Sequence, residues 1–240
     1  MFSNTIEFST DEKYIKNYPF CNPQPTKLNI PEWFKNLNHN PRERTIKGCM
    51  PFLDTLTSGY ILKMPVDYFF TFNETKDNAI GTGYISSFDG KDMNLNYGQE
   101  TFHDPKQLGD KCPFNKKNKN NLFHKILNPW TIKTPSGYSC LFLPPMNNTD
   151  DRFSIIPGIV DTDTFPEEIN FPIIFNGSKY PVLKSTIKIG TPYVQVFPFK
   201  RDNWKMKITS KKNSNLSSFE VLTHVLHNYK NKWWHRKSWK

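Results

Sequence analysis

Short apolar segments separated by turn residues predict that most of this chain forms β-strands. Beyond residue 128, Trp130 and Ile132 occupy alternate positions, and residues 138–143 form an almost continuous apolar run. Further strand candidates follow at 169–175 and on both sides of Gly190, with turn signals about every 8 to 12 residues. This spacing is typical of an all-β sandwich or barrel.

The first 45 residues predict an extended, proline-rich strap with one short helix at 30–38, where Trp33, Phe34 and Leu37 have helical spacing. A barrel domain is expected over residues 46–200. It begins with a short helix after Pro51, a turn at Gly59 and two strands.

Less regular segments are expected within this barrel domain. Glycines at 81–83 and 89–90 predict turns around a strand at 84–88. The lysine-rich segment 111–121 predicts an exposed polar loop. Residues 201–240 predict a basic helix and tail, because Ser217 and Glu220 form a possible capping box ahead of a helical apolar face.

Composition agrees with one β domain carrying appendages. The 240 residues are 36% hydrophobic, which suffices for a core, and the nineteen prolines fit short strands joined by turns. Alanine is scarce while phenylalanine and tyrosine are frequent, which favours strands over helices.

The net charge of +10 is concentrated at the C-terminus. Residues 200–240 hold eleven Lys and Arg against two acids, so the rest of the chain is almost neutral. The tail interleaves aromatic and basic side chains that could contact a nucleic acid or an acidic protein surface: Lys230, Lys232, Trp233, Trp234, Arg236 and Lys237. The favoured alternative is that the tryptophans dock on the barrel or on a neighbouring subunit, because exposure of an indole ring to water is unfavourable.

Metal and membrane signatures are missing from the sequence. The four cysteines are too widely spaced for a zinc site and are expected to be free, buried thiols. His103, Asp104 and His124 lack the spacing of an iron-binding triad. We therefore expect no metal, no cofactor and no membrane contact, and a location in the host-cell cytoplasm or on a particle assembled there.

Residues 158–163 (GIVDTD) and 190–196 (GTPYVQV) resemble the closing turns of the barrel in the dUTPase and dCTP deaminase group. The first follows that group's G-V-I-D-x-D-Y pattern, and the second its G-D-R-I-A-Q-L turn. The resemblance implies a jelly-roll or dUTPase-like β-barrel, with Asp161 and Asp163 as catalytic candidates and Gly158 and Gln195 as nucleotide-binding candidates. Mg²⁺ would be required only for that chemistry.

Two departures weaken the implied activity. The group's phosphate-binding R-S-G-L-A segment should follow residues 138–143, where this chain has PPMNNTDD. The group's glycine-rich C-terminal arm is replaced by a Lys/Trp tail. The competing interpretation of Asp161 and Asp163 is that they stabilise a tight turn through hydrogen bonds to the backbone.

Over most of its length the chain also resembles an uncharacterised family of proteins of similar length from tailed phages and bacteria. The shared segments include PEWF at 31–34, KGCMPFLD at 47–54 and NPWTIKTPSGYSCLF at 128–142. We therefore expect a non-catalytic, phage-associated assembly or binding protein that forms a homo-oligomer, with a trimer as the form related barrels favour. The alternative is a divergent deoxynucleotide-binding or deoxynucleotide-hydrolysing enzyme that uses Asp161.

Overall fold

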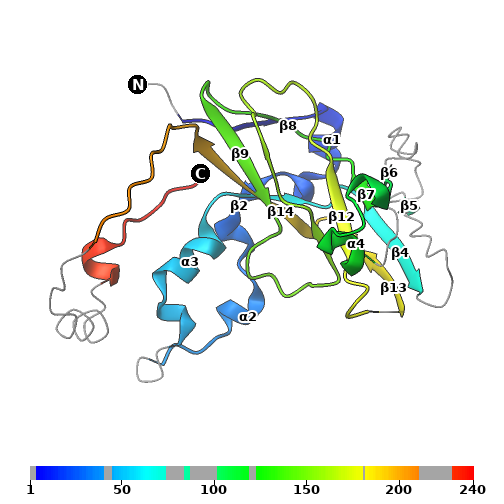
Figure 1. Ribbon diagram of the computed structural model, residues 1–240, viewed down its shortest axis with the longest axis horizontal. Helices are drawn as coiled ribbons and strands as arrows, with labels where there is room; N and C mark the ends of the chain where they lie inside the picture. The colour runs from blue at the N-terminus through cyan, green and yellow to red at the C-terminus, as the bar shows by residue number, and fades with distance from the viewer. Residues whose placement is uncertain are drawn as a thin grey trace.

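The computed structural model describes residues 4–40, 45–73, 84–86, 102–118, 123–180, 182–210 and 229–240. Helices in these residues are short, and they lie beside the sheets (Figure 1). The α-helices among them are α1 (Glu12–Asn17), α2 (Glu32–Lys35), α3 (Met50–Thr57) and α4 (Pro113–Lys117), and the others are short 3-10 helices and one π-helix, η6 (Tyr229–Trp233).

A five-stranded antiparallel sheet forms the centre of the described fold. Its strands lie in the order β11 (Gly158–Val160), β9 (Tyr138–Leu143), β14 (Pro192–Lys200), β3 (Tyr60–Lys63) and β2 (Gln24–Pro25). The longest pairing joins β14 to β9, with Gln195 opposite Leu143 and Lys200 opposite Tyr138. The N-terminal segment is therefore part of the sheet, because β2 pairs with β3.

The remaining described strands form three smaller antiparallel sheets. The largest has the order β10 (Phe153–Ile155), β12 (Phe171–Phe175), β7 (Phe123–Ile126) and β6 (Phe102–His103). Another has the order β13 (Val182–Ile187), β4 (Asp67–Asn73) and β5 (Tyr84–Ser86). β1 (Glu7–Ser9) pairs with β8 (Thr131–Lys133).

The core lies between the five-stranded sheet and the sheet that contains β12. Phe171 of β12 contacts Phe142 of β9 and Tyr193 of β14, with ring centroids 5.3 and 5.8 Å apart. All three rings are buried, and burying such a side chain contributes roughly 1.5–3 kcal/mol. Tyr68 of β4 stacks on Phe175 of β12. This contact packs the sheet of β13, β4 and β5 against the sheet that contains β12.

The all-β prediction is confirmed, since strands dominate the described residues and the helices are few and short. The prediction of an exposed loop at 111–121 holds only in part over its described residues, since Lys111 and Lys116 are exposed but the segment contains a helix and two buried asparagines. Pro113 begins the short helix α4, and the buried Asn115 donates hydrogen bonds to the carbonyl oxygens of Pro105 and Gly109. The buried Asn118 accepts a hydrogen bond from Phe175 N.

Other expectations have mixed outcomes. All four cysteines are free, but Cys49 is exposed and Cys112 half-buried, so burial holds only for Cys21 and Cys140. The turns at 81–83 and 89–90 and the capping box at Ser217 and Glu220 lie outside the described residues. Within the described ranges, no helix has both the length and the apolar character of a membrane span.

A glycine fixes the turn between α3 and β3. Gly59 has a positive φ of 75°, and an added Cβ there would overlap the carbonyl oxygen of Val196 in the neighbouring strand. Gly59 O also accepts a hydrogen bond from Thr26 N, at 3.0 Å. The residue therefore determines how closely the helix–strand turn approaches β14.

We predict that Gly59→Ala destabilises the fold by about 3 kcal/mol, because a left-handed backbone and a steric clash act together. Gly109→Ala is the matched control, since Gly109 has the same φ of 75° with no atom near its Cβ position. Its expected cost is about 1–2 kcal/mol. Urea unfolding of both variants measures the difference, and equal losses would contradict this account of the turn.

Candidate functional site

The turn that carries Asp161 and Asp163 lies at one end of the central sheet. It follows β11, whose Val160 pairs with Cys140 of β9, so the two aspartates come beside Ser139 and Gly137. The end of β14 reaches the same place, because Lys200 pairs with Tyr138. Three segments distant in sequence thus meet at residues 137–139, 161–163 and 201.

Arg201 links these segments. Its backbone N donates to Gly137 O at 2.8 Å, and its guanidinium Nη1 donates to Tyr138 O at 2.7 Å. The same guanidinium makes a two-pronged contact with Asp163, with Nη1 donating to Oδ1 at 2.9 Å and Nη2 donating to Oδ2. Such paired contacts are among the strongest and most directional polar interactions in proteins. We call this arrangement the Arg201 clamp.

Asp163 is held in place by hydrogen bonds within the fold. Its side chain is only 5% exposed, and Gly137 N donates to its Oδ2 at 2.8 Å. The hydrogen bonds from Arg201, followed by that from Gly137, lower the pKa of Asp163 from its usual 3.8 to about 2. Asp163 is therefore ionised at neutral pH and held by fixed donors, which is a poor arrangement for a proton-transferring group.

Asp161 is held more loosely. Ser139 Oγ donates to its Oδ1 at 2.6 Å, and Arg201 Nη1 lies 3.3 Å from the same oxygen. Its side chain is nevertheless 62% exposed. Asp161 O accepts the backbone hydrogen bonds that close the turn, from Thr164 N and Phe165 N.

Thr162 anchors this turn between the two aspartates. It is fully buried, and its Oγ1 lies 2.7 Å from Thr134 Oγ1. Its hydroxyl also contacts Cys140 Sγ at 3.3 Å. On the Thr162 side, the turn therefore packs against β9 and the segment before it.

The two nucleotide-binding candidates lie apart. Gly158 is exposed on β11, its φ is not positive, and a Cβ there would meet no atom within 4 Å, so the local structure does not require glycine. Gln195 is buried in the middle of β14. Its Nε2 donates to Thr55 O and Ser58 O at 3.0 and 2.8 Å, and its Oε1 accepts from Met146 N at 2.9 Å. The Gln195 amide thus joins the end of α3 to the loop after β9.

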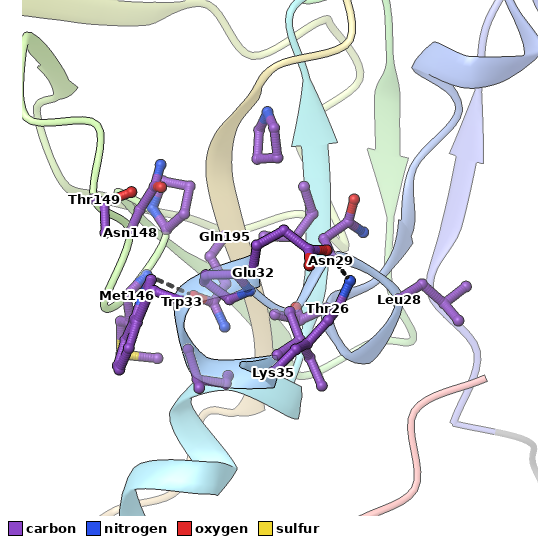
Figure 2. Close-up of a pocket in the computed structure, with 16 residues that line it drawn as sticks. Thr26, Leu28, Asn29, Glu32, Trp33, Lys35, Met146, Asn148, Thr149 and Gln195 are labelled. Carbon is purple, nitrogen blue, oxygen red and sulfur yellow. Dashed lines mark hydrogen bonds and ion pairs between the residues drawn. The ribbon is translucent and has the colours of Figure 1, made fainter. Parts of the chain in front are cut away.

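A groove that the sequence did not reveal lies between the N-terminal segment and the loop after β9. Its volume is about 440 Å³, and the apolar side chains of Leu56 and Ile61 are among those lining it. Figure 2 shows Trp33, Met146, Asn148 and Thr149 on one side of this groove and Leu28 on the other. Glu32 and Lys35 pair near its centre.

This groove depends on contacts between residues far apart in sequence. Trp33 Nε1 donates to Asn147 O at 3.4 Å, and Asn147 has a positive φ of 59°. Asn147 Nδ2 also donates to Thr55 Oγ1 at 2.6 Å. In the sequence, the loop is marked only by the PPMNNTDD segment at 144–151, whose residues differ from a phosphate-binding pattern.

The described part of the tail docks on the same chain. Trp234 Nε1 and Lys237 Nζ both donate to Asp54 Oδ2 of α3, at 3.0 and 2.6 Å. Trp239 packs edge-on against Tyr60 of β3 and Phe197 of β14. Exposed side chains remain along the outside of the tail: Lys230, Lys232, Trp233 and Arg236.

The aspartate turn does not fit a resident Mg²⁺. The carboxylate of Asp163 already forms an ion pair with Arg201. The positive guanidinium would repel a metal ion bound to the same carboxylate. Within the described ranges, no group of three His, Cys, Asp or Glu side chains is arranged to hold a metal ion. His124 is buried, which lowers its pKa to about 4 and keeps its ring neutral.

No family model and no curated protein matches the chain. Among solved structures, it is similar to a mutant dUTPase of Staphylococcus bacteriophage 80alpha with dUpNHpp, at 10% identity and a TM-score of 0.39 over 89% of this chain and 91% of the other. It is also similar to a mutant dUTPase from phage phi11 of S. aureus, at 14% identity and a TM-score of 0.27 over 39% and 75%. Similarity at this level transfers no residue role.

We predict that Asp163→Asn lowers the urea midpoint of unfolding at neutral pH, and that the difference from wild type disappears as the pH falls. A depressed pKa stabilises the fold above the unfolded value of 3.8, and this contribution is lost as the pH falls through about 2. Unfolding monitored by circular dichroism across this range measures the difference.

Glu167→Gln is the control, because Glu167 is an exposed carboxylate that follows the same turn. We expect it to shift the midpoint little at any pH. A difference between wild type and Asp163→Asn that persists unchanged down to pH 2 would contradict the role assigned to the Arg201 clamp.

Proposed function

We propose that this chain is a non-catalytic, phage-associated assembly or binding protein built on a dUTPase-like β-barrel. The observation that carries the proposal is the Arg201 clamp, which engages Asp163 fully and Asp161 in part. The amide of Gln195 is likewise used within the fold, by Thr55, Ser58 and Met146. Of the residues that the dUTPase resemblance singles out, Asp163 and Gln195 therefore have intramolecular partners that account for them, and Asp161 is engaged through one carboxylate oxygen.

A second candidate is a divergent deoxynucleotide-binding or deoxynucleotide-hydrolysing enzyme. The observation in its favour is the exposure of Asp161, whose Oδ2 is not engaged by the hydrogen bonds found at the turn. In such an enzyme Asp161 would orient water or a sugar hydroxyl, and Mg²⁺ would accompany the substrate's phosphates.

For partners, we propose a homo-oligomer, with a trimer as the expected form, and a tail that presents its cations to an acidic surface. Lys230, Lys232 and Arg236 are exposed, while Trp234 and Trp239 pack on the barrel. These two docked indoles are not available for base stacking, so binding of a nucleic acid would rely mainly on the cations, with Trp233 as the exposed indole of the tail, and would weaken steeply with salt.

Incubation with each dNTP and Mg²⁺, followed by measurement of pyrophosphate release, separates the two candidates. We expect no release above background for wild type or Asp161→Ala, because Asp161 serves the turn. Ser139→Ala is a useful companion variant, since it frees Asp161 Oδ1 from its hydrogen-bond donor without removing the carboxylate. Turnover that is present in wild type and lost in Asp161→Ala would overturn the non-catalytic proposal.

We predict that deleting residues 228–240 lowers solubility or changes the assembly state more than it changes DNA affinity. The deletion uncovers Tyr60 and Phe197 and leaves Asp54 without its two donors. Fluorescence anisotropy with labelled DNA at two salt concentrations, together with sedimentation, measures both effects.

The control replaces Lys230, Lys232 and Arg236 by glutamate and keeps the docked tryptophans. We expect its solubility to match wild type. A large loss of DNA affinity from this charge reversal, with a shallower salt dependence, would instead assign the tail to nucleic-acid binding.

A further inference from the structure

The groove between the N-terminal segment and the loop after β9 has an apolar floor and an exposed apolar residue on each side. Leu56 and Ile61 of the floor are each 2% exposed. Leu28 on one side is 63% exposed, and Trp33 on the other is 36% exposed (Figure 2). Single apolar residues on a surface are normal, but two on opposite sides of a cavity of about 440 Å³ are typical of a binding site.

The side of the groove that contains Trp33 is held in place by contacts within the fold. The indole ring packs edge-on against Phe34 and Phe52, with ring centroids 5.6 and 6.0 Å apart. Its Nε1 donates to Asn147 O, and Asn147 is fixed in turn by its hydrogen bond to Thr55. An aromatic side chain that is already ordered loses little conformational entropy on binding, and such residues dominate many protein interfaces.

The floor of the groove also contains a hydroxyl that no described residue engages. Thr26 is 5% exposed and lines the groove, and its Oγ1 has no hydrogen-bond partner in the part of the chain that the structure describes. Burying a hydroxyl without a partner is unfavourable. A ligand with a carbonyl oxygen, such as a peptide backbone, would supply the missing acceptor.

Lysines border the groove. Lys27 lies between two residues that line it, and Lys63 pairs in the sheet with Pro192, which also lines it. Neither lysine forms an ion pair with a carboxylate of the described residues, and Glu32, the one acidic residue that lines the groove, pairs with Lys35. The border of the groove is therefore positively charged and complements an acidic ligand.

An extended peptide fits these features better than a compact small molecule or a nucleic acid. A compact ligand would be enclosed by its pocket, whereas Leu28 and Trp33 are exposed on opposite sides and need a ligand long enough to cover both. A nucleic acid could stack on Trp33 but would gain no stacking from Leu28 and would meet the carboxylate of Glu32. A peptide supplies apolar side chains, backbone carbonyl groups and acidic residues together.

We propose that this groove binds an acidic peptide segment of a partner protein. One large apolar side chain of the peptide lies between Leu28 and Trp33 and covers the floor, and acidic residues beside it contact Lys27 and Lys63. A backbone carbonyl of the peptide accepts a hydrogen bond from Thr26 Oγ1. The inference deepens the binding role proposed above, because it identifies a site and the chemical class of its partner.

Selection from a random short-peptide library displayed on filamentous phage tests the site, with the full chain as bait. We expect the enriched peptides to carry a large apolar residue flanked by aspartate or glutamate, and we expect no enrichment on Trp33→Ser. No enrichment on wild type, enriched peptides that lack acidic residues, or equal enrichment on Trp33→Ser would each overturn the proposal.

Fluorescence anisotropy with the strongest labelled peptide then measures the contribution of each side chain. We expect the affinity to fall at least tenfold in Trp33→Ser and about threefold in Lys27→Glu. Leu108→Ser and Lys106→Glu are the matched controls, because both residues are exposed and neither lines the groove. Losses of equal size in variants and controls would overturn the proposal, as would displacement of the peptide by an equal concentration of a single-stranded oligonucleotide.

Leu28→Ser repeats the test on the other side of the groove without disturbing the packing of Trp33 on Phe52. Its side chain is largely exposed, so we expect an unchanged circular dichroism spectrum and a loss of peptide affinity of about fivefold. An unchanged affinity in Leu28→Ser would contradict the placement of the peptide between the two sides.

Thr26→Val distinguishes a binding role from a structural one, because valine keeps the branched shape of threonine and lacks the hydroxyl. We expect the peptide affinity to fall about fivefold while the urea midpoint of unfolding stays the same or rises, since the hydroxyl has no partner to lose. A lower urea midpoint with unchanged affinity would show that the hydroxyl serves the fold and would contradict the proposed contact.

Failure of the proposed function is a separate result. Asp161-dependent release of pyrophosphate would remove the non-catalytic role and leave peptide binding intact. Loss of peptide binding without turnover would remove only the site proposed for the partner.

Discussion

The contact between Arg201 and Asp163 is the interaction on which the end of the central sheet depends. Through it the first residue after β14 is tied to the turn before β9 and to the turn after β11. Without the guanidinium, the nearly buried carboxylate of Asp163 would keep Gly137 N as a donor but lose its counter-charge. Removing one partner of such a pair is costly because the other remains desolvated and unpaired.

The same contact separates two parts of the C-terminus. Before it, β14 lies within the sheet, where Gln195 connects α3 to the loop after β9. After it, residues 202–210 are exposed, and the described tail at 229–240 contacts Asp54, Tyr60 and Phe197. Arg201 thus lies at the point where the chain leaves the sheet after β14. Asp163 therefore supports the end of β14 through Arg201 and the turn before β9 through Gly137.

The strands could be predicted where the pattern was local. Apolar residues at 138–143 and on both sides of Gly190 correspond to β9, β13 and β14, because their side chains alternate or are buried on both faces. The exposed loop expected at 111–121 was only partly correct, because the burial of Asn115 and Asn118 depends on partners in other segments. The GIVDTD turn was found, but its partner Arg201 lies 38 residues from Asp163, and no spacing rule joins them.

The sequence therefore predicted which residues form the candidate site but not which residues they contact.

The titration of the Asp163 carboxyl carbon, followed by carbon-13 NMR, tests most directly the central claim that Arg201 holds Asp163. The Arg201 clamp predicts a midpoint at about pH 2. It also predicts a higher midpoint in Arg201→Met, which removes the charge and keeps a long side chain. A wild-type midpoint at the usual 3.8, unchanged by Arg201→Met, would show that the aspartate is not held by the fold and would contradict the account.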